Sequence, residues 1–200
     1  KITLDTCKKY GVMVAKQNQT ITEHKYPYYD KDGNNLANKY RKTQNKEFWS
    51  EGSLGECGLF GQHMFNQAGK YITVCEGEID AMSAFQLLGS KYASVSIKNG
   101  ATGALKNCKQ SLEYLNRFEN IVLCFDNDAA GKAAATEVAR LFEPNKCKII
   151  NLEHKDANEY LKMGQREKFT QAWWNAKTYT PAGIINLADL GESLYEETYS

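Results

Sequence analysis

The stretch from Tyr71 to Gly131 decides the fold, because it contains one pattern twice. The first copy reads Tyr71-Ile-Thr-Val-Cys-Glu76-Gly-Glu-Ile-Asp80, and the second reads Ile121-Val-Leu-Cys-Phe-Asp126-Asn-Asp128-Ala-Ala-Gly131. In each copy an apolar run rich in β-branched and aromatic residues ends at a carboxylate, and a helix-forming run follows. Each copy therefore predicts a buried strand, an acidic turn and a helix.

Three carboxylates, Glu76, Asp126 and Asp128, follow the ends of these two strands. Open α/β sheets bind their ligands at the edge where the strands end, so we expect the three side chains to meet there. Acidic groups held close together repel one another unless a divalent cation lies between them, and hard oxygen ligands suit Mg²⁺. The sequence therefore predicts a carboxylate-lined Mg²⁺ site, with Mn²⁺ as the alternative ion.

These motifs resemble those of the TOPRIM domain, which DnaG-type primases share with topoisomerases, OLD-type nucleases and RecR-like repair proteins. Further matching pieces lie at residues 59–63, 155–159 and 174–176. The likeness runs in order from about Thr3 to the C-terminus, and it is to the primase half of the primase–helicases of T-odd bacteriophages and their relative Twinkle. It implies an α/β fold of TOPRIM type, with a mainly parallel sheet flanked by helices.

The resemblance also implies roles for the acids. Glu76 is expected to take part in metal or proton chemistry, and Asp126 and Asp128 are expected to bind Mg²⁺. Asp156 matches a further acid of the family and is a candidate ligand of a second metal ion. Its alternative role is the N-cap of a helix that begins at the next residue.

The first motif contains two more acids, Glu78 and Asp80, which fall near the start of the predicted helix. Acids at that position are favoured by the helix dipole. We expect Asp80 to support the site from behind the metal ligands, whereas Glu78 fits that role and helix stabilisation equally well. Gly77 is expected to allow a close approach of the backbone.

Phosphoryl transfer also requires cations opposite the metal. Lys39-Tyr-Arg41 corresponds to a Lys-x-Arg motif of the phage primases, whose lysine binds nucleotide phosphates together with a second lysine downstream. Lys46 is expected to be that second lysine, and its alignment requires a one-residue insertion. We expect these three residues to bind the nucleotide or the template. The alternative role for strand lysines is that of solvated edge charges.

Five aromatic residues lie among these cations: Tyr26, Tyr28, Tyr29, Phe48 and Trp49. Stacking on template bases is one explanation for them. Packing in the core of a small sheet is the other, and we expect it for about half of the five.

The chain divides into three expected parts. Residues 1–69 predict a small basic subdomain of mixed α+β structure, with strands at 11–16, 20–29 and 36–41 around a turn at 30–33. Residues 70–180 alternate strand and helix, which predicts the TOPRIM catalytic subdomain, with a glycine-bearing loop at 99–103. Residues 181–200 correspond to a linker toward a helicase domain, with a short acidic segment at 187–195.

Charge follows the same division. Residues 1–70 carry eleven Lys or Arg against seven acids, whereas residues 151–200 carry five against eight. A basic region beside an acidic metal site suits a polyanionic substrate. The six cysteines form no closely spaced pair, so no zinc site is expected here, and reduced thiols suit a cytosol-like compartment. No apolar run reaches membrane-spanning length, and no membrane partner is expected.

These features predict the RNA-polymerising domain of a DNA primase, an enzyme that makes short RNA primers from NTPs on single-stranded DNA during replication. The absence of an initial Met and of a P-loop suggests a fragment. The expected partners are therefore a replicative helicase domain and a zinc-binding template-recognition module outside this chain. The expected compartment is the cytoplasm of a phage-infected bacterium, with an organelle as the alternative. Two other functions remain open: a TOPRIM nuclease or topoisomerase, and a Twinkle-like DNA-binding or assembly module.

Overall fold

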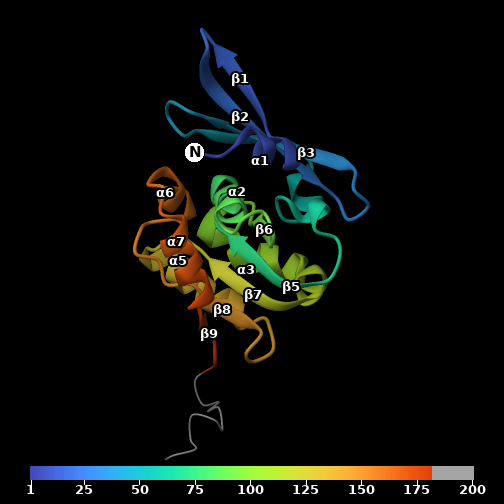
Figure 1. Cartoon of the computed structure of the whole chain (residues 1–200). Coiled ribbons are helices and arrows are strands. Elements are labelled where there is room, and N and C mark those ends of the chain that lie inside the picture. Colours follow the sequence, from blue (N-terminus) through green and yellow to red (C-terminus); the bar gives the residue numbers. More distant parts are fainter. Residues whose placement is uncertain (182–200) are drawn as a thin grey trace, which may run out of the picture.

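The computed structural model describes residues 1–181 and contains two sheets, which lie one above the other in Figure 1. Sheet A comes first in the chain and is antiparallel, with the strand order β1-β2-β3-β4. Its strands are β1 (Met13–Gln17), β2 (Thr20–Tyr29), β3 (Asn35–Lys42) and β4 (Phe48–Gly52). The flanking elements are the helix α1 (Leu4–Lys9) and two 3₁₀ turns, η1 (Leu54–Glu56) and η2 (Gln62–Met64).

Sheet B has the strand order β6-β5-β7-β8-β9, and all of its neighbouring strands are parallel except β9, which runs antiparallel to β8. Its strands are β5 (Gly69–Cys75), β6 (Ala93–Ser96), β7 (Phe118–Cys124), β8 (Cys147–Ile149) and β9 (Lys177–Thr178). The helices that accompany it are α2 (Glu78–Leu87), α3 (Gly100–Gln110), α4 (Leu112–Asn116), α5 (Ala129–Ala139), α6 (Ala157–Lys162) and α7 (Arg166–Trp174).

Buried side chains alternate along the central strands of sheet B, as they do in a strand that is covered on both faces. Ile72 and Val74 of β5 belong to a core cluster with residues of α3 and α5. Cys75 faces the opposite cluster, which contains residues of α2, α6 and α7. Trp173 fixes this second layer, because its indole N–H donates to the hydroxyl of Thr73 at 2.9 Å. The predicted mainly parallel sheet with helices on both faces is thus confirmed.

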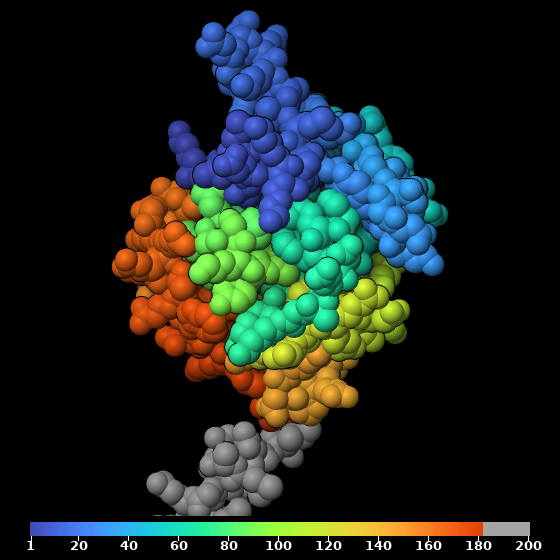
Figure 2. Space-filling view, turned by 45° about the vertical axis from the view of Figure 1, so that its right-hand side comes forward, coloured from blue at the N-terminus to red at the C-terminus, as the bar shows by residue number. Residues whose placement is uncertain are grey.

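Sheet A packs on this unit through aromatic residues of β2. Tyr26 and Tyr28 are each 1% exposed and contact Phe60 in the cluster that includes α2. Tyr10 stacks on the same ring, and its hydroxyl donates to a carbonyl of β6. Two of the five aromatic residues among the cations are therefore core residues, whereas Phe48 stays half exposed. Figure 2 shows the hairpin of β1 and β2, in blue, standing clear of the packed body.

The strands predicted at 11–16, 20–29 and 36–41 and the turn at 30–33 are confirmed, with small shifts of their ends. Strand β4 and helix α1 were not expected, because both are short and neither has a clear apolar period. The division of the chain at residues 69 and 180 stays a prediction. The linker expected at 181–200, with its acidic segment at 187–195, lies beyond the described residues except for its first position.

The expectation of a loop at residues 99–103 was wrong. Asn99 is the N-cap of α3, and the helix begins at Gly100, whose φ of +66° allows the sharp entry into it. The backbone N–H of Ala101 donates to the carboxylate of Glu76, which satisfies one of the free donors at this helix end. Two glycines in the first turn suggested a loop, and a contact remote in the sequence makes the turn helical.

No helix within residues 1–181 has the length and apolar character that crossing a membrane requires.

Candidate active site

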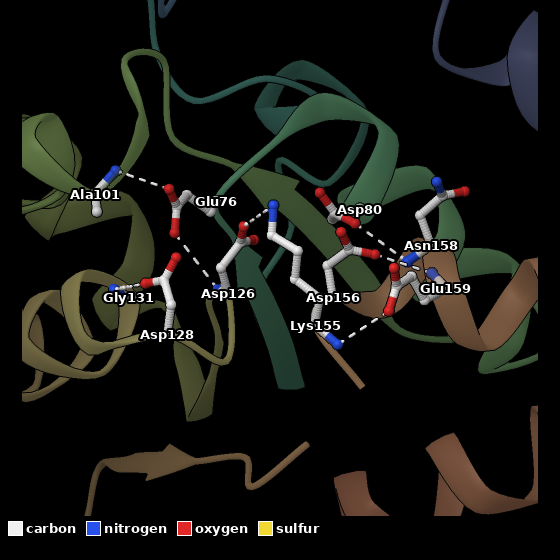
Figure 3. A network of polar contacts seen from close by, with 10 residues as sticks. All are labelled: Glu76, Asp80, Ala101, Asp126, Asp128, Gly131, Lys155, Asp156, Asn158 and Glu159. Carbon is white, nitrogen blue, oxygen red and sulfur yellow. Dashed lines mark hydrogen bonds and ion pairs between the residues drawn. The ribbon is translucent and has the colours of Figure 1, made fainter. Parts of the chain in front are cut away.

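The acids that follow β5 and β7 lie side by side because of the strand register. Cys75 pairs with Cys124 across the two parallel strands, and Glu76 comes directly after the first of them. Asp126 comes two residues after the second. Both carboxylates therefore emerge at the same edge of sheet B, as expected from the sequence (Figure 3).

Glu76 is held by backbone N–H groups from two elements. Its Oε1 accepts from Ala101 at the start of α3 at 3.1 Å, and its Oε2 accepts from Asp126 at 3.4 Å. Helix N-termini carry partial positive charge, which suits a carboxylate at this position. Partial burial nevertheless raises the pKa of Glu76, and the neighbouring carboxylate of Asp126 raises it further.

Asp128 is the N-cap of α5, and its Oδ1 accepts from the N–H of Gly131 at 2.8 Å. The side chain is exposed, and Figure 3 shows its carboxylate beside those of Glu76 and Asp126. Gly131 has to be glycine here, because a Cβ would lie 2.2 Å from the carbonyl oxygen of Asp126. The acidic turn and the start of α5 are thus packed together too closely for any side chain at that position.

A second group of acids shares Asp126. Carboxylate oxygens of Asp80, Asp126 and Asp156 all lie within 4.8 Å of one another. Asp80 stands in the first turn of α2, where its Oδ1 accepts from the N–H of Asn158 at 3.1 Å. Three carboxylates at such separations form a donor set that fits a hard divalent cation.

Asp156 is an N-cap, as its alternative role predicted, and its carboxylate also lies in this group of acids. Its Oδ1 accepts from the N–H of Glu159 at 2.9 Å, so it is the N-cap of α6, and it also faces the other acids. Burial raises the pKa of Asp80 to about 8, and the charge of Asp156 adds to the effect. A carboxyl group in this state requires either a proton or a cation nearby.

One lysine partly balances this charge. The Nζ of Lys155 lies 3.3 Å from Oδ2 of Asp126, and this contact raises the pKa of the lysine. Burial raises the pKa of Asp126 in turn, and the ammonium group opposes that shift. The loop that carries Lys155 is tied to the acidic turn, because the N–H of Asn127 donates to its carbonyl at 2.7 Å. Lys155 belongs to the matching piece at residues 155–159, but no role was predicted for it.

Asp80 lies among the acids at the edge of sheet B, and its expected supporting role stays a prediction. It was expected behind the metal ligands, yet it belongs to the tighter of the two acidic groups, while Glu76 and Asp128 lie on the other side of Asp126. The signal was present, because Asp80 falls in the first turn of a helix that begins shortly after β5 ends. The start of such a helix lies at the same edge of the sheet as the strand end.

Sheet A contributes cations to the opposite side of the site. The Nζ of Lys39 lies 2.7 Å from Oε1 of Glu78 and donates to the carbonyl of Lys98, also at 2.7 Å. Glu78 is buried and also accepts from the hydroxyl of Tyr28. Glu78 therefore pairs with residues of sheet A. Neither of its two expected roles, support of the metal ligands and stabilisation of the helix, includes this contact. The sequence did not single out Lys98, whose ammonium group is buried and donates to the carbonyl of Cys57 at 2.6 Å.

The two remaining predicted cations occupy different places. Arg41 lies with its guanidinium carbon 5.6 Å from the ring centre of Phe48, and its Nε is buried without a hydrogen-bond partner among the described residues. Lys46 is exposed in the loop between β3 and β4, with a φ of +58°. It is not among the described residues that line the cleft.

Sheets A and B enclose a cleft of roughly 530 Å³ that contains most of these side chains. Acids line one part of it and cations line another, so the cleft fits a ligand that carries both bound metal and negative charge. The described residues that line it are Lys39, Phe48, Glu76, Gly77, Glu78, Asp80, Lys98, Asn99, Gly100, Asp126 and Lys155. Gly77 lies close to Asp80, since a Cβ at that position would be 3.0 Å from its carboxylate.

The acidic motifs and the fold both match known proteins. Residues 73–161 match the family model described as Toprim-like. The chain is 35% identical to the DNA helicase/primase of Enterobacteria phage T3 over 195 residues, which are 98% of this chain and 34% of that protein. The chain thus spans about a third of the length of this relative.

Solved structures agree with this match. The chain superimposes with a TM-score of 0.80 and 37% identity on a structure containing bacteriophage T7 primase domains, bound there to an RNA/DNA hybrid and dTTP and interacting with the lagging-strand DNA polymerase. That match covers 90% of each chain. The primase fragment of the T7 primase–helicase gives a TM-score of 0.77 at 36% identity, covering 86% of this chain and 70% of that one.

Proposed function

Because this chain belongs to the Toprim-like family of phage primase domains, we propose that it is the RNA-polymerising domain of a DNA primase. It joins ribonucleotides into short primers on single-stranded DNA. One observation carries the proposal: the acids at the strand ends of sheet B and three cations, Lys39 of sheet A with Lys98 and Lys155, line one cleft. Nucleotidyl transfer requires this pairing of metal ligands with cations that neutralise phosphate charge.

The acids divide the metal-binding work between them. Glu76, Asp126 and Asp128 would hold Mg²⁺, or Mn²⁺ in its place, and Asp156 together with Asp80 would provide ligands on the other side of Asp126. Bound Mg²⁺ would stabilise the negative charge on the attacking and leaving oxygens at the α-phosphate. Asp126 is common to both sides, so it aligns the two groups of ligands.

The cations hold the substrate. Lys39 and Arg41 bind the phosphates of the nucleotide or of the template, because both lie on β3 over the ring of Phe48, and Lys39 also reaches the carboxylate of Glu78. Lys46 approaches the triphosphate from the loop after β3. In the absence of metal, Lys155 neutralises Asp126. With metal bound at Asp126, the ammonium group of Lys155 would be free to face the phosphates.

The relatives support the choice of partners. We propose that the chain acts together with a replicative helicase domain, because its phage T3 relative is named as a DNA helicase/primase. A zinc-binding module outside this chain recognises the template, and NTPs and single-stranded DNA are the substrates. The compartment is the cytoplasm of a phage-infected bacterium.

A ribonucleotide incorporation assay tests the proposal. The chain is incubated with labelled NTPs, single-stranded DNA and Mg²⁺, alone and with a phage zinc module supplied separately, and products are resolved by length. We expect short RNA products that disappear when Mg²⁺ is chelated. If neither mixture gives RNA products and the chain instead cleaves linear or supercoiled DNA, the proposed primase function is wrong. The chain is then a Toprim nuclease or topoisomerase.

A further inference from the structure

Phe48 is an aromatic side chain in a cleft that is otherwise polar. It opens β4 and pairs with Arg41 of β3, so both side chains extend from the same face of sheet A. Among the described residues that line the cleft, Phe48 has the only apolar side chain. It is 50% exposed, which leaves a large part of the ring available for contact.

Two cations lie over this ring. The Nζ of Lys39 is 5.0 Å from the ring centre, and the guanidinium carbon of Arg41 is 5.6 Å away. The electron-rich face of the ring attracts both groups. The ring of Phe48 is therefore a flat, uncharged surface, and it lies directly beside the proposed phosphate-binding cations Lys39 and Arg41.

The order of groups across the cleft matches the parts of a nucleotide. The acids lie at the strand ends of sheet B, Lys39 extends from sheet A to Glu78 above them, and Phe48 lies over Lys39. A nucleoside triphosphate has the same sequence of parts, because metal-bound phosphates come first and an aromatic base comes last. Bases stack on aromatic side chains whatever their sequence, since each base has a π-face.

We propose that Phe48 is the stacking platform for the base of a nucleotide bound in this cleft. This proposal rests on the proposed primase function, for which it names the residue that holds the base. Phe48 positions the nucleotide and takes no part in bond making. It accepts all four bases, because stacking does not read hydrogen-bonding groups.

The neighbouring residue provides a matched control. Trp49 follows Phe48 on β4, so its side chain points to the opposite face of sheet A. There it stacks on Tyr40, with ring centres 5.0 Å apart and planes 6° from parallel. Trp49→Ala removes a larger aromatic ring from the same strand without changing the cleft.

The experiment compares the binding of ATP with that of inorganic tripolyphosphate, which has the phosphates and lacks the base. Dissociation constants are measured by calorimetry in Mg²⁺ for the wild type, Phe48→Ala, Phe48→Tyr and Trp49→Ala, after circular dichroism has shown that each variant folds. We expect Phe48→Ala to weaken ATP binding about tenfold or more. Tripolyphosphate binding stays within a factor of about two, and Phe48→Tyr binds ATP like the wild type.

Two outcomes would overturn the proposal. Unchanged ATP binding by Phe48→Ala would show that no base stacks there. Equal losses of ATP and tripolyphosphate binding would show that Phe48 acts only by holding Lys39 and Arg41. ATP binding requires neither template nor turnover, so it is measured independently of primer synthesis. A wild-type chain that binds ATP through Phe48 but makes no primers would contradict the primase function. The proposed role of Phe48 in base stacking would still hold.

Discussion

The acids of the cleft come from the edge of sheet B, whereas sheet A contributes the cation Lys39, and the two kinds of charge are held in different ways. The acids of sheet B are fixed by backbone N–H groups at strand ends and helix starts, as for Glu76 with Ala101 and Asp128 with Gly131. The cation Lys39 of sheet A is fixed across the boundary between the sheets, by the carboxylate of Glu78 and the carbonyl of Lys98. The acids therefore depend on the path of the backbone, whereas Lys39 depends on how the two sheets pack.

Substitutions on the two sides of the cleft should therefore have different effects, on the reaction in one case and on the packing of the two sheets in the other. An acid-to-amide substitution removes a carboxylate ligand, whereas the amide oxygen that remains can accept the same backbone N–H groups. A substitution of Lys39 breaks a contact between the sheets, so it changes stability or substrate binding before it changes the reaction. The following substitutions test that distinction, beginning with the largest expected effect.

Asp126→Asn is expected to reduce primer synthesis by about a thousandfold or more. Asp126 is the acid common to both groups, so its loss removes a ligand from each side. The measurement is the rate of ribonucleotide incorporation on single-stranded DNA in Mg²⁺, with circular dichroism as the check of the fold. Asp128→Asn is expected to act in the same direction, and asparagine keeps the N-cap of α5.

Glu153→Gln is the matched control for these variants. Glu153 is an exposed acid near the same loop, and its ion-pair partner among residues 1–181 is the surface residue Lys168. It should retain wild-type activity. If Asp126→Asn kept activity within a factor of about ten of the wild type, the acidic cluster would not be the catalytic centre, and the comparison of the two sheets would lose its basis.

Lys39→Met is expected to lower the free energy of unfolding by about 3 kcal/mol, because it leaves the buried carboxylate of Glu78 without its cation. Urea denaturation gives the measurement. The double variant with Glu78→Gln should recover part of the loss, since the uncompensated charge is then gone. Lys42→Met is the control, because Lys42 pairs with Glu47 in solvent and should change stability little. Equal stability of Lys39→Met and Lys42→Met would mean that Lys39 does not join the sheets.

The pH dependence of stability reports on Asp80. Burial raises its pKa from 3.8 to about 8, so in the absence of metal the folded protein binds a proton there that the unfolded chain has lost. The contribution of this group to stability is full below about pH 4 and is lost as the pH rises toward 8. Asp80→Asn should therefore raise Tm by roughly 5 °C at pH 8 in a chelator, and by almost nothing at pH 4. A constant difference between the two proteins across this range would refute the raised pKa.

How far the sequence predicted the site follows from the same contrast. Glu76, Asp126 and Asp128 were found because an apolar strand followed by an acid is a local pattern, and parallel strands bring such ends together. Lys155 was not selected, because its contact with Asp126 depends on how the loop before α6 folds back. The helical start at Gly100 was missed for a similar reason, since its stabilising partner, Glu76, is remote in the sequence.

Lys46→Ala is expected to have the smallest effect, a rise of about three- to tenfold in KM for NTPs with little change in kcat. Lys46 is exposed in the loop after β3, so it acts on the triphosphate through a screened charge. The effect should therefore shrink as salt is raised, whereas the loss caused by Asp126→Asn should not. Lys31→Ala, in the loop at the other end of β3, is the control and should leave KM unchanged. If KM stays constant in Lys46→Ala as well, the second phosphate-binding cation is one that lines the cleft, and Lys98 and Lys155 are then the residues to substitute.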